Sequence, residues 1–279
     1  MKIKFKKMHG AGNDFVVMTF TEDLPKDLSQ LAISMCDRHF GIGADGMMIA
    51  APSQTSDINM IFYNADGTIA EMCGNGVRCF SRYVFEEGLV QSTHFDVETL
   101  AGVQNIELKE KNGLVNSVRV VMGKPILESK SIPAVSKSDL FADEPVLIDD
   151  KKYMLTSMRV GVPHTMIFND TFDSDMVLEI GPIVEKHMYF PEKTNVNFVE
   201  VMNKDNMRVA TWERGAGATL ACGTGACASF YAAFSKGLVG ASVTIHVPGG
   251  TLQISLSENG EIIMEGNAVL VAEGYYYNE

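Results

Sequence analysis

Two cysteines of this chain have the same local surroundings, and their neighbours could support proton transfer. The segments Cys73-Gly74-Asn75-Gly76 and Cys222-Gly223-Thr224-Gly225 lie 149 positions apart. Each segment places a thiol before a glycine-rich turn, and a run of small or apolar residues that is typical of a helix follows each turn. A repeated thiol at a repeated helix start suggests two half-sites that face one substrate.

The backbone beside each thiol is suited to an anion. Backbone N–H groups of Gly74-Asn75 and Gly223-Thr224 can point at a carboxylate, and a helix start carries partial positive charge. Such a setting lowers the pKa of a thiol below its usual value of about 8.5. One thiolate could remove a proton from the carbon next to the carboxylate. The opposite thiol could then protonate the other face of that carbon, which inverts its configuration.

A carbanion at such a carbon is unstable without an electron sink. No segment indicates a pyridoxal phosphate or nucleotide site, so we predict no cofactor. The chemistry would instead need donors fixed around the carboxylate and two domains that close over the substrate and exclude water. On the residues alone, an alternative stays equally open: both segments are ordinary helix starts with buried thiols.

Two other patterns predict no additional site. Residues 41–46, Gly-Ile-Gly-Ala-Asp-Gly, match the dinucleotide-binding pattern, but a helical pattern precedes them and a strand-like segment, 47–50, follows. A dinucleotide site needs the reverse order, so we predict a turn. The cysteine pairs 73/79 and 222/227 lack the spacing of zinc motifs, so we predict no metal site. Cys36, Cys79 and Cys227 lie in apolar helical segments and are predicted to be buried.

Strand patterns outnumber helical patterns in this sequence. Alternating apolar residues predict strands at 60–63, 103–108, 117–122, 165–168, 196–201 and 208–212. Helical patterns cover 28–36, 76–88, 176–187 and 226–236. Short turns between strands favour an α+β fold over a doubly wound sheet.

The order of these elements repeats along the chain. Each half runs through strands, a helix, strands, the cysteine turn, a helix and strands. We therefore predict an N-terminal domain over 1–122, completed by the last strand at about 267–279, and a C-terminal domain over 123–266.

Composition limits the classes of partner. The net charge is −12, which argues against nucleic acid and anionic membranes, because phosphate binding needs a basic surface. No apolar run reaches the roughly 18 residues of a membrane span. The N-terminus lacks a signal-peptide pattern, and the five cysteines are an odd number, so a reducing, cytoplasmic location is predicted.

Five segments closely resemble the diaminopimelate epimerase family, and they occur in the order of that family. They are residues 8–15 (MHGAGNDF), 64–67 (NADG), 72–79 (MCGNGVRC), and 213–217 (ERGAG) with 221–225 (ACGTG). The resemblance spans nearly the whole chain. It implies two similar strand-rich, barrel-like domains, each around a central helix, with the active site in the cleft between them.

The resemblance also implies the reaction and the site. It implies cofactor-independent epimerisation by a thiolate base and a thiol acid, here Cys73 and Cys222. Gly74, Asn75, Gly223 and Thr224 would hold the reacting carboxylate. Polar groups of the substrate would contact Asn13, Asn64, Asn195, Glu213 and Arg214, with the planar Arg214 fork suited to a second carboxylate. His164, in Pro163-His164, would tune the two thiols together with Glu213.

Three positions depart from the family pattern and leave the substrate open. Val162 replaces an Asn found in many members, Ala218 replaces a Glu, and Gly46 stands where some members carry Gln. The expected reaction interconverts LL- and meso-diaminopimelate for lysine and peptidoglycan synthesis. The alternative is a racemase of another amino acid, such as histidine. A non-catalytic binding or thiol-redox protein is a third class. Members of the family often form homodimers, and we expect one here.

Overall fold

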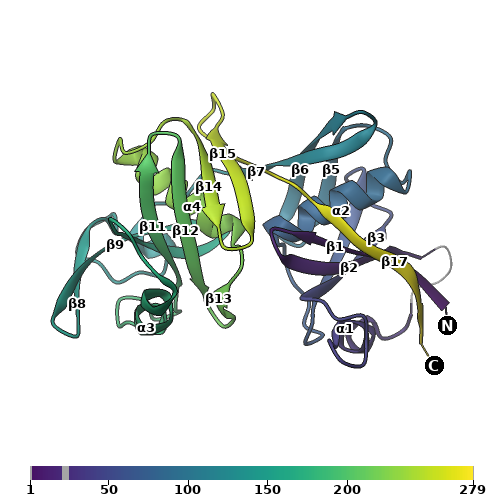
Figure 1. The fold of residues 1–279 in the computed structure, drawn as a ribbon, viewed down its shortest axis with the longest axis horizontal. Coiled ribbons are helices and arrows are strands. Elements are labelled where there is room, and N and C mark those ends of the chain that lie inside the picture. Colours follow the sequence, from purple (N-terminus) through teal and green to yellow (C-terminus); the bar gives the residue numbers. More distant parts are fainter. Residues whose placement is uncertain (1, 21–24, 279) are drawn as a thin grey trace. The chain divides into compact units, whose positions relative to one another are not determined.

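The chain forms two compact units. The structure, a computed structural model, describes residues 2–20 and 25–278 (Figure 1). Unit 1 comprises the chain up to Val120 together with the segment from Glu265 onward, and unit 2 comprises Val121–Met264. The chain leaves unit 1 within β7 (Leu114–Gly123) and returns to it within β16 (Ile262–Gly266).

The elements of unit 1 repeat in unit 2 in the predicted order. Unit 1 contains β1 (Lys2–Gly10), β2 (Asn13–Thr19), α1 (Leu28–Cys36), β3 (Gly46–Ala51), β4 (Ile58–Asn64), α2 (Gly74–Glu86), β5 (His94–Thr99), β6 (Gly102–Lys111) and β17 (Val269–Tyr277). Unit 2 contains η1 (Ser129–Ser131), β8 (Glu144–Ile148), β9 (Lys151–Val160), β10 (Val162–Phe168), α3 (Ser174–Glu185), β11 (Asn195–Asn203), β12 (Asn206–Glu213), β13 (Gly217–Thr219), α4 (Gly223–Ser235), β14 (Ser242–Val247) and β15 (Gly250–Leu256).

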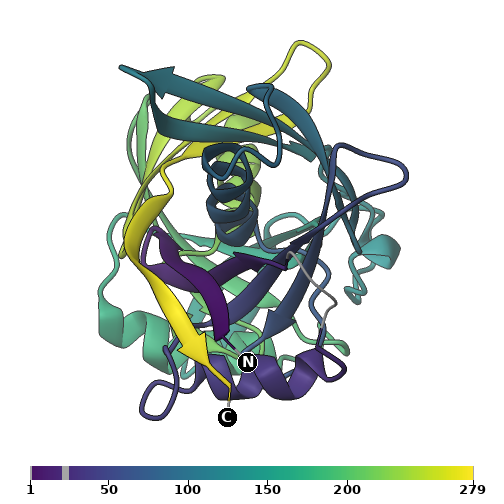
Figure 2. The same ribbon diagram turned by 90° about the vertical axis from the view of Figure 1, so that its right-hand side faces the viewer.

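Each unit wraps strands around one helix. Ten of the 13 residues of α2 are buried, which is typical of a helix inside a fold rather than on its surface. Strands β1, β2, β3 and β6 contact α2, and Figure 2 shows the helix inside a ring of strands. Helix α4 is buried in the same way among β9–β12, β14 and β15. The predicted α+β fold with a central helix in each half is confirmed.

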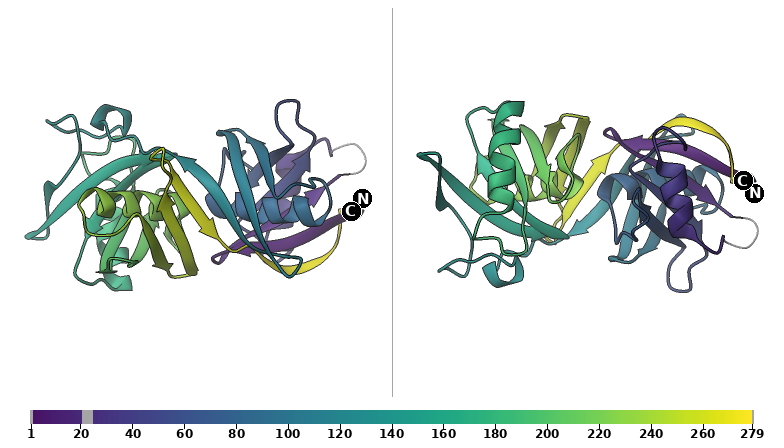
Figure 3. Two further views of the ribbon diagram at one scale, coloured as in Figure 1. Left: turned by 90° about the horizontal axis from the view of Figure 1, so that it is seen from above. Right: turned by 90° about the horizontal axis from the view of Figure 1, so that it is seen from below.

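The other helix of each unit covers the outside of its strands. In α1, Leu31, Ala32 and Met35 pack against Met47 and Ile49 of β3. In α3, the apolar side also packs on strands, chiefly β11 and β12. Figure 3 shows α1 and α3 on the outer face of their own units. α1 matches the predicted helix 28–36, whereas α3 begins and ends two residues before the predicted 176–187.

The two central helices begin earlier than predicted. The glycine-rich segments were expected to be turns before helices at 76 and 226, but α2 begins at Gly74 and α4 at Gly223. Cys73 and Cys222 are the residues that precede the first helical turn, both with extended backbone. Because glycine has weak helix propensity, the local sequence did not predict that the first turns of α2 and α4 are helical.

Close packing explains why glycine occupies the first turn of each central helix. A Cβ at position 76 would lie 2.0 Å from Met48 Cε, and one at position 225 would lie 2.3 Å from Asn197 Oδ1. Both approaches are far inside van der Waals contact. The glycines therefore let a strand approach the start of each helix.

The last strand lies beside the first. β17 pairs antiparallel with β1 and lies within the segment 267–279 where the last strand was predicted (Figure 1). The 41–46 segment forms a turn that leads into β3, as predicted. Among the described residues, no helix has the length and apolar character needed to cross a membrane.

Candidate active site

The pairing of β2, β3 and β4 places the predicted polar residues of unit 1 at one edge of these strands. β2 runs parallel to β3, and β3 runs antiparallel to β4. Gly46 lies opposite both Phe15 of β2 and Asn64 of β4. The start of β2, which carries Asn13, therefore lies at the same edge as Asn64. We call Asn13, Asn64, Cys73, Gly74 and Asn75 the first half-site.

Two amides of the first half-site adjoin the Cys73 thiol. Cys73 Sγ lies 3.4 Å from Asn13 Oδ1, which also accepts a hydrogen bond of 3.4 Å from Asn75 Nδ2. The thiol is half-buried at the N-terminus of α2. A helix N-terminus favours negative charge, so this position suits a thiolate or a substrate carboxylate. The structure thus brings Cys73 and Asn75 to Asn13, which precedes them by 60 and 62 positions.

Charged residues outside the predicted set hold both amides in one orientation. Asn13 Nδ2 donates to Asp45 Oδ2 over 2.6 Å, so its Oδ1 turns toward Cys73. The buried Arg78 donates to Asn75 Oδ1 over 2.9 Å and to the Gly74 carbonyl over 3.0 Å. Asn75 therefore turns its NH₂ group toward the half-site.

The sequence motifs did not identify Arg78 and Asp45 as functional residues. Arg78 follows Asn75 by three positions, which places the two on one face of a helix. That spacing was an available signal once the helix was known to begin at Gly74. Asp45 gave no local signal, because its partner Asn13 is 32 positions away and the strand register brings them together.

Unit 2 repeats this strand arrangement. β10 runs parallel to β11, with His164 opposite Asn195, and β11 runs antiparallel to β12, with Val196 opposite Trp212. His164, Asn195 and the end of β12 at Glu213 therefore lie at one edge. We call His164, Asn195, Glu213, Arg214, Cys222, Gly223 and Thr224 the second half-site.

Asn195 fixes the backbone around Arg214. Its Oδ1 accepts a hydrogen bond of 2.7 Å from the Arg214 backbone N–H, and its Nδ2 donates to the Pro163 carbonyl over 3.0 Å. Arg214 Nη1 also donates to the Glu192 carbonyl over 2.9 Å. The buried amide thus ties the start of β10 to the turn that carries the arginine.

The remaining polar groups of the second half-site have local partners. Thr219 Oγ1 donates to Glu213 Oε1 over 2.6 Å, which holds that carboxylate across the β12–β13 turn. Cys222 is buried at the N-terminus of α4, and its Sγ lies 3.5 Å from Thr224 Oγ1. A hydroxyl at that distance can donate to a thiolate.

His164 is a neutral group in the folded protein. It is fully buried, and burial is the main cause that lowers its pKa from 6.5 to about 3, with the positive charge of Arg214 adding to the shift. An imidazole with this pKa is uncharged at neutral pH. His164 can therefore donate or accept a hydrogen bond but brings no positive charge to the second half-site.

The buried His164 predicts a loss of stability in acid. Between pH 6.5 and about 3 the unfolded chain binds a proton at this residue and the folded chain does not, so falling pH favours unfolding. At pH 5 this difference amounts to about 2 kcal/mol relative to pH 7.5. Urea unfolding of the wild type and His164→Gln at both pH values measures it. Equal losses in the two proteins would contradict the neutral, buried imidazole.

The other three cysteines are buried, as predicted. Burial raises the pKa of the Cys36 thiol and of the Cys79 thiol to about 12 each. Cys227 is fully buried in α4. Thiols with so high a pKa as those of Cys36 and Cys79 stay protonated and unreactive at neutral pH.

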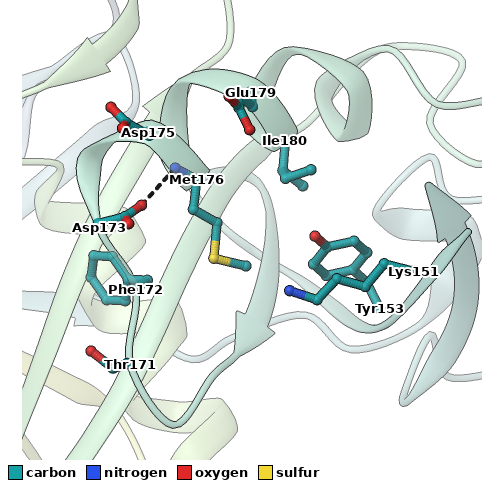
Figure 4. A pocket seen from close by; sticks show the side chains of 9 residues that line it. All are labelled: Lys151, Tyr153, Thr171, Phe172, Asp173, Asp175, Met176, Glu179 and Ile180. Carbon is teal, nitrogen blue, oxygen red and sulfur yellow. Dashed lines mark hydrogen bonds between the residues drawn. The ribbon is translucent and has the colours of Figure 1, made fainter. Parts of the chain in front are cut away.

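A surface pocket of unit 2 contains none of the predicted site residues. It encloses about 410 Å³ between β9 and the start of α3, and Figure 4 shows Met176 between Phe172 and the side chains of Lys151 and Tyr153. Asp173 in its wall accepts a hydrogen bond from the Met176 backbone N–H. Asp173 is thus the N-terminal cap of α3. Within the described ranges, no cluster of His, Cys, Asp and Glu is arranged to hold a metal ion.

The sequence as a whole matches one family. The family model described as diaminopimelate epimerase matches residues 5–128 and 156–271. The chain belongs to this family. A diaminopimelate epimerase of Alkaliphilus metalliredigens is 49% identical over 280 residues, covering 100% of this chain and 99% of that protein. One of Caldanaerobacter subterraneus is 50% identical over 272 residues, covering 98% of each. The predicted family membership is confirmed.

Solved structures of other enzyme groups share the fold of this diaminopimelate epimerase family member. A probable proline racemase from Agrobacterium radiobacter superposes with a TM-score of 0.74 at 15% identity, covering 99% of this chain and 93% of that one. A phenazine biosynthesis protein of the PhzF family from Bacillus anthracis gives a TM-score of 0.73 at 13% identity, with full coverage of both chains. At these identities the likeness concerns the fold.

The three departures from the family pattern lie on different strands. Val162 is the exposed first residue of β10, Ala218 is the exposed middle residue of β13, and Gly46 is the first residue of β3. A Cβ at Gly46 would lie 2.6 Å from the Phe62 ring and 2.7 Å from the Tyr63 carbonyl. This chain therefore has no room for the glutamine of other family members unless β4 shifts.

Proposed function

We propose that this chain is a diaminopimelate epimerase, which interconverts the LL and meso forms by inverting one α-carbon without a cofactor. The observation that carries this proposal is the placement of Cys73 and Cys222 at the N-termini of two equivalent central helices. Full-length similarity to proteins named diaminopimelate epimerase supports the substrate. The product serves lysine and peptidoglycan synthesis.

The two thiols exchange protons with the α-carbon. A thiolate at one cysteine removes the α-proton, and the thiol of the other cysteine delivers its proton to the opposite face. Each turnover leaves the two cysteines with their protonation states exchanged, so the reverse reaction uses the same pair. Inversion requires both half-sites to act on a single substrate molecule.

Backbone donors at the helix starts stabilise the reacting carboxylate. The N–H groups of Gly74, Asn75, Gly223 and Thr224 belong to the first helical turns, where N–H groups have no partner within the helix. Together with the helix dipoles they stabilise the negative charge that spreads onto the carboxylate as the proton leaves. His164 and Glu213 adjust the acidity of the thiols.

The far end of the substrate is bound by the remaining residues of the two half-sites. Arg214 is exposed at the β12–β13 turn, and its guanidinium group is suited to the second carboxylate. Asn13, Asn64 and Asn195 supply amides, and Glu213 supplies a carboxylate for the second ammonium group. Together these residues select a substrate that carries an amino-acid group at each end.

The two compact units act as the two domains, with β17 completing the N-terminal one. We propose that the protein is a cytoplasmic homodimer. The exposed apolar side chains Val271, Tyr275 and Tyr277 on β17 support self-association, since large apolar groups on a strand invite a partner. Light scattering after gel filtration should give twice the chain mass, whereas a monomer at micromolar concentration would refute the dimer.

Product formation tests the proposed substrate. Purified protein is incubated separately with LL-diaminopimelate and with single amino acids, including L-histidine, and the stereoisomers are separated chromatographically. We expect meso-diaminopimelate and no D-histidine. Val162 and Ala218 motivate the alternative, a racemase of another amino acid such as histidine. Formation of D-histidine with LL-diaminopimelate left unchanged would establish that alternative.

A further inference from the structure

A buried polar network adjoins His164 in unit 2. Asn197 and Thr211 are buried on β11 and β12. Asn197 Nδ2 lies 3.3 Å from His164 Nδ1, and Thr211 Oγ1 donates to Asn197 Oδ1 over 2.9 Å. The asparagine thus stands between the imidazole and the threonine.

The network lies against the first turn of α4. A Cβ at Gly225 would meet Asn197 Oδ1 at 2.3 Å, Thr211 Oγ1 at 3.1 Å and Cys222 Cβ at 3.3 Å. These three atoms therefore surround one point at the helix start. Asn197 connects the His164 ring to the turn that carries the Cys222 thiol.

The surroundings fix which way the Asn197 amide points. The group facing His164 also lies 3.4 Å from the Thr165 carbonyl oxygen, which can only accept. An amide NH₂ donates there, whereas an amide oxygen would be repelled. The Thr211 hydroxyl can donate or accept, so it imposes no contrary orientation. Nδ2 therefore faces His164, and Oδ1 faces Thr211.

This orientation decides where the imidazole proton resides. Asn197 Nδ2 is a donor, so His164 Nδ1 must accept and carries no proton. The neutral ring then carries its proton on Nε2. Among the residues that the structure describes, the buried Nε2 has no hydrogen-bond partner. A buried N–H without a partner is unfavourable, so an acceptor supplied during function would offset that penalty.

We propose that Asn197 is a positioning residue that holds His164 as a neutral Nε2–H donor for an anion in the second half-site. Under the proposed function, on which this inference rests, the anion is the Cys222 thiolate or the substrate carboxylate. A donor fixed in this way stabilises negative charge without taking a proton from either group. His164 accordingly adjusts charge at the site and does not act as a base.

Nitrogen NMR of the full chain with ¹⁵N-labelled histidine tests the proton position directly. The His164 ring signals are assigned by their loss in His164→Gln. In the wild type we expect a protonated Nε2 and an unprotonated Nδ1. In Asn197→Asp the carboxylate accepts a hydrogen bond, so the proton should move to Nδ1. In Thr211→Val, which adds no charge and leaves the Thr165 carbonyl in place, the proton should stay on Nε2.

A matched control separates positioning from loss of stability. Ser157→Ala removes another buried hydrogen bond of unit 2, that to Thr165, without touching Asn197 or His164. It should keep the Nε2 proton and the wild-type kcat. Asn197→Asp should lower kcat about 10- to 100-fold, the range of one lost charge-stabilising hydrogen bond.

Two results would overturn the inference. One is a wild-type ring protonated on Nδ1. The other is an Asn197→Asp variant that moves the proton but retains the wild-type kcat. Absence of activity on diaminopimelate would refute the proposed function instead, and the proton position would still decide the role of Asn197.

Discussion

Replacing Cys73 or Cys222 with alanine should lower kcat for diaminopimelate epimerisation by about 10³-fold or more, since positioned acid or base groups contribute about 10²- to 10⁴-fold each. Inversion needs a base on one face of the α-carbon and an acid on the other. Either alanine variant removes one of them. The remaining thiol cannot complete the reaction, so both single variants should be almost inactive.

Buried cysteines on the same helices provide matched controls. Cys79 lies on α2 and Cys227 on α4, and both are fully buried. Cys79→Ala and Cys227→Ala leave the thiols at the helix starts in place, so kcat should stay within a few-fold of wild type. Circular dichroism establishes that all four variants are folded. Substantial activity in folded Cys73→Ala or Cys222→Ala would remove the basis of the two-thiol mechanism.

Arg214→Leu should raise KM for diaminopimelate about 10- to 100-fold, because a hydrogen bond to a charged group contributes about 1.5–3 kcal/mol. The Asn195 amide holds the backbone N–H of Arg214, so the guanidinium group starts from a fixed position. Its loss removes the partner of the second carboxylate. Because that carboxylate does not react, kcat should fall much less than KM rises.

Two further variants identify the cause of the KM change. Arg214→Lys keeps the positive charge but lacks the planar fork, so its KM should lie between those of wild type and Arg214→Leu. Arg208, an arginine elsewhere in unit 2, pairs with Glu200. Arg208→Leu should leave KM unchanged. Equal KM values for Arg214→Leu and wild type would assign recognition of the far end to other residues.

The sequence predicted which helices and strands occur better than it predicted the residues at which they begin and end. Residues 28–36 matched α1 fully, because its apolar spacing is a local property. The starts of α2 and α4 were placed two and three residues too late. Glycine has low helix propensity, yet Gly76 and Gly225 lie in helices at positions where a Cβ would come within 2.0 Å of Met48 Cε and 2.3 Å of Asn197 Oδ1. Tertiary packing, which local patterns do not contain, fixed these boundaries.

The residues of the candidate site were predicted from motifs, and their partners were not. Asn13, Cys73 and Asn75 adjoin one another as the motifs implied. Asp45 and Asn197 were missed because each orients a side chain on a different strand. Such contacts depend on strand register, and no motif in the sequence around either residue indicates them.

The two half-sites share their backbone arrangement but differ in chemistry. At the 149-residue offset of the two cysteines, Arg78 corresponds to Cys227 and Asn75 to Thr224. Unit 1 therefore has a buried guanidinium group in the first turns of its central helix, where unit 2 has a thiol. The nearest printed partner of the Cys73 thiol is an amide oxygen, that of Asn13, whereas that of the Cys222 thiol is a hydroxyl, that of Thr224.

Epimerisation in heavy water tests the two-thiol inversion most directly. LL-Diaminopimelate is incubated with the enzyme in D₂O, and substrate and product are recovered at low conversion for mass spectrometry. Two separate thiols predict meso product with one deuterium at the inverted α-carbon and unreacted LL substrate with almost none. Meso product that retains the original hydrogen would indicate a single base acting on both faces, and that result would contradict the mechanism.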